Sequence, residues 1–119
     1  YIERKSIQDW AGTMSKGYDR FRRELNRAAE FEARIVVLVE SNLNDVFSIG
    51  FSPQTQMIKA TPDFLLHRMR EIMDDFGDVQ FLFVDGRVVA AGVLVKLLTL
   101  KNDIKFLDTQ WLYDAGKLK

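Results

Sequence analysis

The spacing of hydrophobic and polar residues along the first third of the chain changes from the pattern of a strand to that of a helix. Residues 1–5 (YIERK) have the length of a short strand, and Ser6 follows as a candidate N-cap with Asp9 three residues on. Apolar side chains then recur at helical spacing over residues 6–31. Two glycines interrupt this run, so the pattern predicts two helices joined by a turn at SKGYD (15–19).

Two runs rich in β-branched and aromatic residues predict the remaining strands. RIVVLVE (34–40) and VQFLFV (79–84) are apolar throughout their middle, which is typical of strands that are buried on both faces. Between them, LNDVF (43–47) predicts a short helical turn. The polar residues that follow, up to residue 60, include a glycine and a proline and predict an ordered loop.

Helix signals mark the two segments on either side of the last strand. Thr61 as cap, Pro62 at the first helical position and Gly77 as the stop predict one helix. Residues 87–101 have two interpretations, because Asp85-Gly86 is also a good hairpin turn. Their run is about twice the usual strand length of roughly 5–6 residues, which favours a helix.

This order of elements predicts an α/β domain with a central, mostly parallel sheet flanked by helices, followed by a tail over residues 102–119. The chain has 119 residues, of which 47% are hydrophobic, so it suits one domain with a substantial core. No apolar run reaches the length of a membrane helix, so we expect no membrane partner.

Charge and composition narrow the functional classes. The 17 basic residues balance 17 acidic ones, so any binding to nucleic acid requires a local basic patch. The chain has no cysteine, which excludes disulfides and thiolate metal sites and favours an intracellular protein of the cytoplasm or nucleus. A bound metal must therefore use oxygen ligands or the single histidine, His67, which we expect at the surface.

The first strand carries three charged residues in a row. Alternate side chains of a strand share a face, so Glu3 and Lys5 project to one side and Arg4 to the other. An acid beside an amine suits metal-assisted phosphodiester hydrolysis: the carboxylate holds a hard cation, and the ammonium orients water and offsets phosphate charge. Asp9 lies within plausible reach. The alternative is an edge-strand ion pair worth about 0–1 kcal/mol, with Asp9 serving only the helix dipole.

The run ERKSIQD (3–9) matches a known signature. It resembles the ERKxxxD motif in the nuclease domain of XPF-type structure-specific endonucleases, a branch of the PD-(D/E)XK nuclease superfamily. The similarity continues through Arg20-Phe21, the basic helix FRRELNRAAEF and a strand that ends Leu-Val-Glu at Glu40. Residues 62–101 are similar to the second half of the family, where a strand such as VQFLFV precedes an alanine-bearing helix.

The resemblance implies a restriction-endonuclease-like, three-layer nuclease domain over residues 1–101, with residues 102–119 packing on the domain or on a dimer interface. Its activity would be hydrolysis of DNA phosphodiester bonds, at branched, fork or flap structures, with Mg²⁺ or Mn²⁺. The carboxylate of Glu3 and the backbone carbonyl of Arg4 would be metal ligands, and Lys5 the catalytic amine. The catalytic signature residues are Glu3, Arg4, Lys5 and Asp9, and Arg20 would reach a DNA phosphate.

Two features of the family are missing from these residues. The family places an essential aspartate, usually after a glycine, in a β-hairpin before the ERK strand, and this sequence begins too late to contain it. A tandem helix-hairpin-helix DNA-binding module does not follow residue 101 either. Two alternatives therefore stay open: a degenerate nuclease that binds DNA or a partner subunit without cutting, and a protein-interaction domain whose ERK strand is structural.

A local excess of positive charge lies in the basic helix. Between Lys16 and Arg27 there are five basic and two acidic residues, and phosphate contacts dominate non-specific DNA affinity. The sequence therefore predicts a DNA footprint here, with a solvated helix face as the alternative. The candidate residues are Arg20, Arg22, Arg23 and Arg27. Glu40 ends a strand near the expected site. The simpler interpretation of this residue is that it only caps the end of the strand.

The C-terminal half has a surplus of apolar side chains. VVAAGVLVKLLTL (88–100) is hydrophobic nearly all round, and a sheet can cover only one side of such a helix. The tail adds aromatic and apolar residues of the kind enriched at interface cores: Phe106, Trp111, Leu112 and Tyr113. We therefore predict a homodimer formed through this half. The alternative is that the tail folds back over the helix within one chain.

Overall fold

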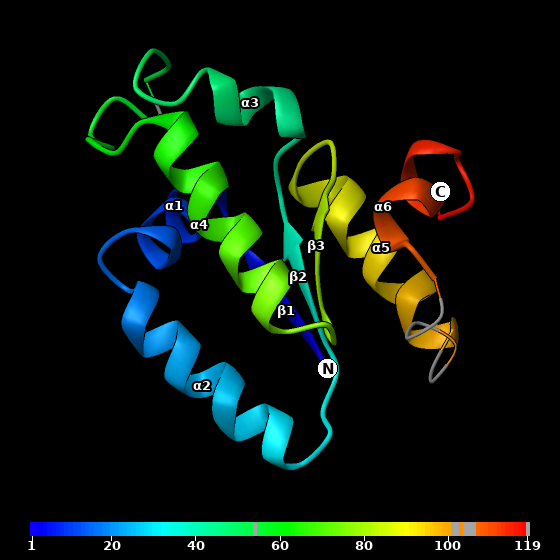
Figure 1. Cartoon of the computed structure of the whole chain (residues 1–119). Helices are drawn as coiled ribbons and strands as arrows, with labels where there is room; N and C mark the ends of the chain where they lie inside the picture. Colours follow the sequence, from blue (N-terminus) through cyan, green and yellow to red (C-terminus); the bar gives the residue numbers. More distant parts are fainter. Residues whose placement is uncertain (54, 101–102, 104–106, 119) are drawn as a thin grey trace.

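A computed structural model of the chain describes residues 1–53, 55–100, 103 and 107–118. Its centre is a sheet of three parallel strands, β1 (Ile2–Lys5), β2 (Ile35–Val39) and β3 (Val79–Phe83), in the order β1-β2-β3. Helices cover both faces of this sheet (Figure 1). The predicted α/β class with a parallel sheet is confirmed, and the described residues add no antiparallel strand to it.

The helices divide into two layers (Figure 1). One face of the sheet carries the elements that connect its strands, and the other face carries the elements that follow β3. The first layer holds α1 (Ile7–Met14), α2 (Tyr18–Glu30) and α4 (Pro62–Asp75); the second holds α5 (Arg87–Leu100) and α6 (Thr109–Asp114); α3 (Leu43–Phe47) lies beyond the end of β2. Both strand crossovers pass over the same face, as expected when successive parallel strands are added in one direction with one handedness.

The strand register divides the core between these layers. Val37 and Phe81 are paired neighbours that face the first layer, whereas Leu38 and Leu82 are paired neighbours that face the second. Trp10 is fully buried in the first layer, where its ring meets Phe83 edge-on at 5.4 Å between centroids. Each large apolar side chain buried in this way contributes about 1.5–3 kcal/mol to stability. Burial of side chains from both faces of the strands therefore stabilises the packing of both helix layers on the sheet.

Hydrogen bonds at two helix starts confirm the predicted caps. The Ser6 hydroxyl accepts the Asp9 N–H at 3.1 Å, and the Thr61 hydroxyl accepts the Phe64 N–H at 3.2 Å. Each bond satisfies a backbone donor that has no partner inside its helix, which contributes about 1 kcal/mol. Local sequence therefore determines where α1 and α4 begin.

The segment after β3 is a helix, as predicted, and the hairpin interpretation is wrong. Gly86 has a φ of +119°, a conformation that L side chains rarely adopt, and it turns the chain from β3 into α5. The predicted stop of α4 is confirmed: the helix ends at Asp75 with Phe76 as its C-cap, and Gly77 is the first residue beyond the cap, where a stop glycine is expected. The Phe76 N–H donates to the Ile72 carbonyl at 2.8 Å, so Gly77 follows the last turn and does not form it.

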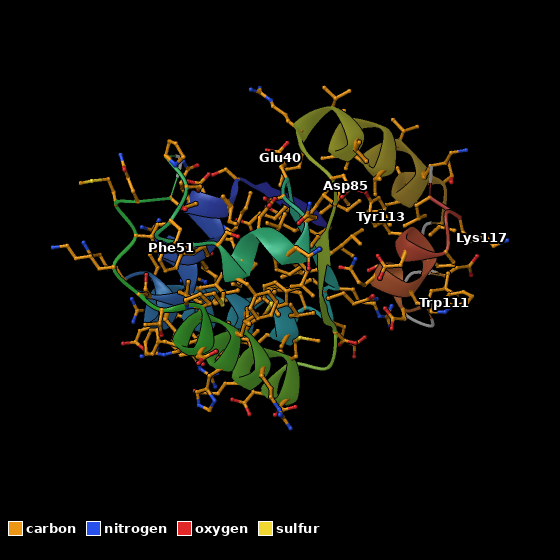
Figure 2. All side chains as sticks on the ribbon, turned by 90° about the horizontal axis from the view of Figure 1, so that it is seen from above. Glu40, Phe51, Asp85, Trp111, Tyr113 and Lys117 are labelled. Carbon is orange, nitrogen blue, oxygen red and sulfur yellow. The ribbon has the colours of Figure 1, made fainter. Side chains whose placement is uncertain are left out.

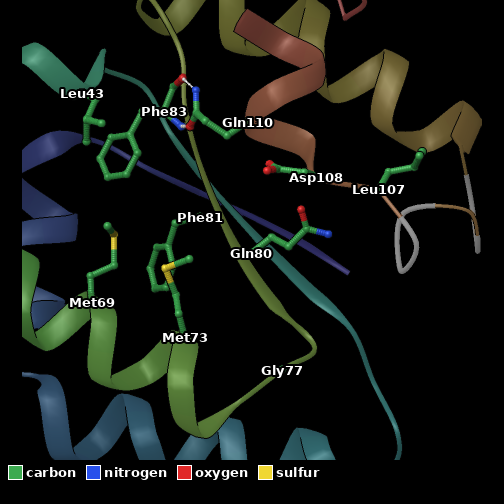
Figure 3. A pocket seen from close by; sticks show the side chains of 10 residues that line it. All are labelled: Leu43, Met69, Met73, Gly77, Gln80, Phe81, Phe83, Leu107, Asp108 and Gln110. Atoms are coloured by element: carbon green, nitrogen blue, oxygen red, sulfur yellow. Dashed lines mark hydrogen bonds between the residues drawn. The ribbon is translucent and has the colours of Figure 1, made fainter.

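The tail contains a helix, α6, that the sequence did not predict. Its side chain Gln110 pairs with the backbone of Phe83: the Phe83 N–H donates to Gln110 Oε1 at 2.8 Å, and Gln110 Nε2 donates to the Phe83 carbonyl at 3.1 Å (Figure 3). β3 is an edge strand, so this amide takes the place of a neighbouring strand at one residue.

A buried tyrosine fixes the other end of α6. The Tyr113 hydroxyl accepts the Asp85 N–H at 2.9 Å and donates to the Asp85 carboxylate. Burial raises the pKa of Tyr113, and the hydrogen bond to Asp85 raises it further. Tyr113 and Leu118 belong to the core of the second layer, so the described part of the tail packs on its own domain beside α5. Phe106 lies outside the described residues.

Candidate active site

Glu3 and Lys5 extend from the same face of β1, as the alternation of the strand requires. The Lys5 ammonium lies 3.4 Å from Glu3 Oε1 and 6.0 Å from the centre of the Phe21 ring. Only 15% of the Lys5 side chain is exposed, against 32% of Glu3. The acid and the amine are therefore adjacent. This geometry suits the catalytic interpretation, and it equally forms the simple ion pair.

These two side chains open into a pocket that we call the β1 pocket. Its volume is about 390 Å³, and its walls come from β1, α1 and α2. The structure brings four of the predicted site residues to it: Glu3, Lys5, Asp9 and Arg20. Residues 17 positions apart in sequence meet here because α1 and α2 fold back over the edge strand. The pocket is also lined by Gln8, Gly12, Thr13, Gly17, Phe21 and Glu24.

Several lining residues were missed by the sequence analysis. Gln8, Gly12 and Thr13 stand beside Asp9 at spacings of one, three and four residues, so they share one face of α1. Following that helical face from Asp9 would have found them. Glu24 lies one turn beyond Arg20 and pairs with it at 3.6 Å. The pocket therefore holds acids on three elements, with Lys5 and Arg20 as its cations.

The side chain of Arg4 lies on the opposite face of β1. Its guanidinium donates to the Glu40 carboxylate, and Nη2 lies 3.4 Å from the Arg87 carbonyl oxygen. This contact ties the carboxyl ends of β1 and β2 to the start of α5. Figure 2 shows Glu40 at this end of the sheet. Glu40 is thus the partner of Arg4, and the structure brings neither side chain into the β1 pocket.

The backbone of Arg4 faces away from the sheet. The Val36 N–H donates to the Tyr1 carbonyl at 3.0 Å, and the Glu40 N–H donates to the Lys5 carbonyl at 2.8 Å. The odd-numbered residues of β1 therefore bond to β2, and the carbonyl of Arg4 points outward. β1 is an edge strand with no neighbour beyond it among the described residues, so this edge can accept another strand.

The oxygen donors beside Lys5 fit a hard divalent cation in type. A carboxylate from Glu3 and the outward carbonyl of Arg4 are ligands that Mg²⁺ and Mn²⁺ prefer. These two donors are few. Mg²⁺ takes an octahedral set of six oxygens, although several of them are usually waters. Within the described residues no group of three or more acids, histidines or cysteines could hold a metal ion. The described residues thus offer two oxygen donors of a suitable type here, fewer than a complete octahedral site uses.

The four arginines predicted to bind DNA do not lie on one surface. Arg22 packs between α2 and α4: Nη2 is 2.6 Å from Asp75 Oδ2, and the guanidinium lies over the rings of Tyr18 and Phe76. The hydrogen bond to Asp75 raises the pKa of Arg22. Burial raises the pKa of Tyr18, whose hydroxyl accepts from Arg22 at 3.2 Å. Arg22 therefore fastens the two helices together.

The other three arginines share a face. Arg20, Arg23 and Arg27 are spaced by three and four residues along α2, and Lys16 lies in the turn that precedes this helix. We call these four residues the basic stripe. All are exposed, Arg20 pairs with Glu24 at the surface, and neither Arg23 nor Arg27 forms an ion pair with any described residue. Their charges are therefore available to a polyanion, and the stripe begins at the β1 pocket through Arg20.

The fold and the site together define an α/β domain with a parallel sheet and a charged pocket at one edge strand. Comparisons of the chain with protein-family models, with curated proteins and with solved structures found no match. His67 is at the surface as predicted, where it pairs with Glu71 at 3.0 Å. Among the residues that the structure describes, no helix is both long and apolar enough to cross a bilayer.

Proposed function

We propose that this protein is a metal-dependent DNA endonuclease of the XPF type, with a restriction-endonuclease-like core, that cleaves branched, fork or flap DNA. The observation that carries the proposal is the β1 pocket. It unites Glu3, Lys5 and Asp9 of the ERKxxxD signature with Arg20, the first cation of the basic stripe. An acid and an amine beside a cationic approach are the side chains that phosphodiester hydrolysis requires.

The signature residues and Arg20 each have a role in this proposal. Glu3 and the Arg4 carbonyl would hold Mg²⁺ or Mn²⁺, which when bound would supply Lewis-acid chemistry toward the phosphate and water. Lys5, held by Glu3 and by the Phe21 ring, orients the attacking water and offsets charge on the phosphate. Asp9 accepts a hydrogen bond at the rim of the pocket, and Arg20 contacts a neighbouring phosphate of the same strand.

In this proposal, a second carboxylate ligand would come from a strand that pairs with the open edge of β1. A strand added there would bond to the outward backbone groups of Ile2 and Arg4. The resemblance places an essential aspartate in a hairpin that precedes the ERK strand, which is the position from which a strand can reach this edge. Its carboxylate would then stand beside Glu3 and complete an oxygen ligand set.

Dependence on a divalent cation tests this function directly. The full-length protein is incubated with end-labelled fork, flap and linear duplex DNA of equal length, with Mg²⁺, with Mn²⁺ or with EDTA. We expect cleavage near the branch of fork and flap DNA with either metal, little cleavage of linear duplex, and none in EDTA. Cleavage that persists in EDTA, or no cleavage of any substrate with either metal, would contradict the proposal.

The basic stripe makes a separate prediction about DNA binding. We expect the double substitution Arg23→Gln/Arg27→Gln to weaken fork binding and to reduce the slope of log K against log salt. Each lost phosphate contact lowers that slope by roughly 0.9. The measurement is fluorescence anisotropy of labelled DNA at several salt concentrations. An unchanged slope would locate the DNA footprint elsewhere.

Arg22→Gln is the matched control for this experiment. It removes one guanidinium charge from the same helix, where the double variant removes two, and it removes it from the face that packs on α4. We expect an unchanged salt slope together with a free energy of unfolding that is lower by about 1–3 kcal/mol, because Asp75 and Tyr18 lose a charged hydrogen-bond partner. If Arg22→Gln reduced the slope of log K against log salt as much as the double variant does, DNA binding would not depend on the exposed face of α2.

One observation favours a second candidate function, that of a DNA-binding module without nuclease activity. The described residues contain too few metal ligands for a complete site, whereas the basic stripe needs no metal to bind phosphate. This candidate predicts salt-dependent fork binding with no cleavage in any metal. The metal-dependence experiment above separates the two candidates, because binding and cleavage are measured on the same DNA.

A further inference from the structure

The loop between α3 and α4 exposes two large apolar side chains to solvent. Phe51 is 89% exposed and Met57 is 84% exposed. Burial of a side chain of this size usually stabilises a protein by about 1.5–3 kcal/mol, and this loop forgoes that gain. Figure 2 shows Phe51 at the end of the molecule opposite the end that carries Trp111. Phe51 is therefore outside the part of the molecule that the C-terminal helices occupy.

The backbone beneath Phe51 is tightly hydrogen-bonded. Thr55 is only 3% exposed, and its hydroxyl accepts the Gly50 N–H at 3.1 Å and lies 2.6 Å from the Ser52 hydroxyl. The Ile58 N–H donates to the Thr55 carbonyl at 2.9 Å, and Ile49 is buried in the core of the first layer. Phe51 thus projects from a part of the loop that is already hydrogen-bonded, which reduces the number of groups that a ligand covering its ring must order.

The surface beside Phe51 is suited to the backbone of a nucleic acid strand. A polar pocket of about 380 Å³, which we call the loop pocket, connects the loop to the start of α1. Hydroxyl and amide groups of this kind commonly contact phosphate and sugar. The neutral polar residues that line it are Ser6, Gln8, Ser41, Ser48, Ser52 and Thr55.

The acids of the loop pocket are engaged with other groups. Glu40 is neutralised by Arg4, and the Asp45 carboxylate accepts the Ser41 hydroxyl at 2.5 Å. The sequence of the loop, residues 48–60, contains no acid and one lysine, Lys59. Gln8 lines both the loop pocket and the β1 pocket, so a strand that leaves the candidate active site can continue toward Phe51.

We propose that Phe51 is a base-stacking residue, on which an unpaired base at the branch of the DNA substrate rests while the adjoining backbone follows the loop pocket to Glu3 and Lys5. The proposal rests on the proposed nuclease function and specifies how its substrate is recognised. A single aromatic ring stacks on any base, so recognition depends on the DNA being unpaired and not on its sequence. Fully paired duplex offers no free base and gains nothing from Phe51.

The test combines affinity with photocross-linking in the full-length protein. Fork DNA carries 5-iodouracil at one position at a time through the branch, and binding is measured in EDTA so that no cleavage occurs. We expect ultraviolet cross-links from unpaired positions at the branch to map to Phe51. Phe51→Ala is expected to lose these cross-links and to bind fork DNA roughly 5- to 150-fold more weakly, the range found for loss of one stacked base.

Three companion measurements define the effect. Phe51→Trp is expected to restore both the cross-link and the affinity, whereas Phe51→Leu keeps an apolar group and loses both, because stacking needs an aromatic face. Linear duplex is expected to bind all of these variants within about twofold of the original protein, since no base is unpaired there. Phe31→Ala is the matched control: its ring is 82% exposed at the end of α2, and we expect it to change nothing.

The possible failures are distinguishable. If the unaltered protein cleaves fork DNA but Phe51→Ala binds and cross-links as before, the stacking role is overturned and the nuclease function is unaffected. In that case the exposed ring is left as a surface for a protein partner. If the unaltered protein neither binds nor cleaves fork DNA, the proposed function itself fails, and the stacking role fails with it.

Discussion

Glu3→Gln is expected to reduce cleavage of fork and flap DNA by the full-length protein at least a hundredfold. A metal ion stabilises the charge of a phosphoryl transition state by several kcal/mol, and each 1.36 kcal/mol is a factor of about ten in rate. Gln keeps the volume of the side chain and removes the negative charge that would hold the cation. The measurement is single-turnover cleavage with Mg²⁺ and with Mn²⁺.

Folding of the variant should be unaffected. Glu3 is partly exposed, and its ion pair with Lys5 at 3.4 Å is worth about 0–1 kcal/mol at such a site. A free energy of unfolding, measured in urea, that falls by no more than about 1 kcal/mol would exclude unfolding as the cause of lost activity. Glu30→Gln, the same substitution at the exposed end of α2, is the control and should cut normally. Cutting by Glu3→Gln at a normal rate would end the assignment of Glu3 as a metal ligand.

Leu98→Lys is expected to convert a homodimer into a monomer, because α5 has one covered side and one open side. Ala90, Val93 and Leu97 are buried against the sheet and the tail. On the opposite side, Val88, Val95 and Leu98 are 88%, 62% and 61% exposed. The predicted apolar surplus of this helix is therefore real, and the described part of the tail does not cover it. We propose that a second copy of the chain does.

The exposed side of α5 is complementary to itself. Val88, Ala91, Val95 and Leu98 follow one another at spacings of three, four and three residues, which is symmetric about the middle of the set. Two such helices packed antiparallel about a twofold axis would bring Val88 against the partner's Leu98, and Ala91 against the partner's Val95. The helix carries no acid, so each copy meets an apolar surface without burying an unpaired carboxylate.

Sedimentation equilibrium across a wide concentration range tests this interface. We expect a dimer mass for the unaltered protein and for Phe31→Lys, whose site lies on α2 in the other layer, and a monomer mass for Leu98→Lys with its helical circular dichroism retained. Leu94 is unsuited to this test, because it packs against the core of the second layer and a lysine there would disturb folding. A monomer mass for the unaltered protein at high micromolar concentration would rule the dimer out.

The sequence by itself determined the elements and much of the candidate chemistry. Hydrophobic spacing, residue type, run length and cap signals together predicted every described strand and every described helix before α6, because each of these signals is local in sequence. Caps at Ser6 and Thr61 were predictable because the bonding partner lies three residues away. The common face of Glu3 and Lys5 followed from the same alternation. Helix α6 escaped because it has six residues, too few to establish a period.

Only the tertiary structure decided which charges act together. Five basic residues in one segment looked alike in sequence, yet Arg22 packs on α4 while Arg23 and Arg27 face solvent. Arg4 meets Glu40, 36 positions away, and so leaves the pocket that Glu3 and Lys5 share with Arg20. The physical reason is that a charged side chain interacts with whatever the packed elements bring within a few ångströms of it. Local spacing specifies the direction of a side chain from its own element, and the fold of distant elements specifies what it meets there.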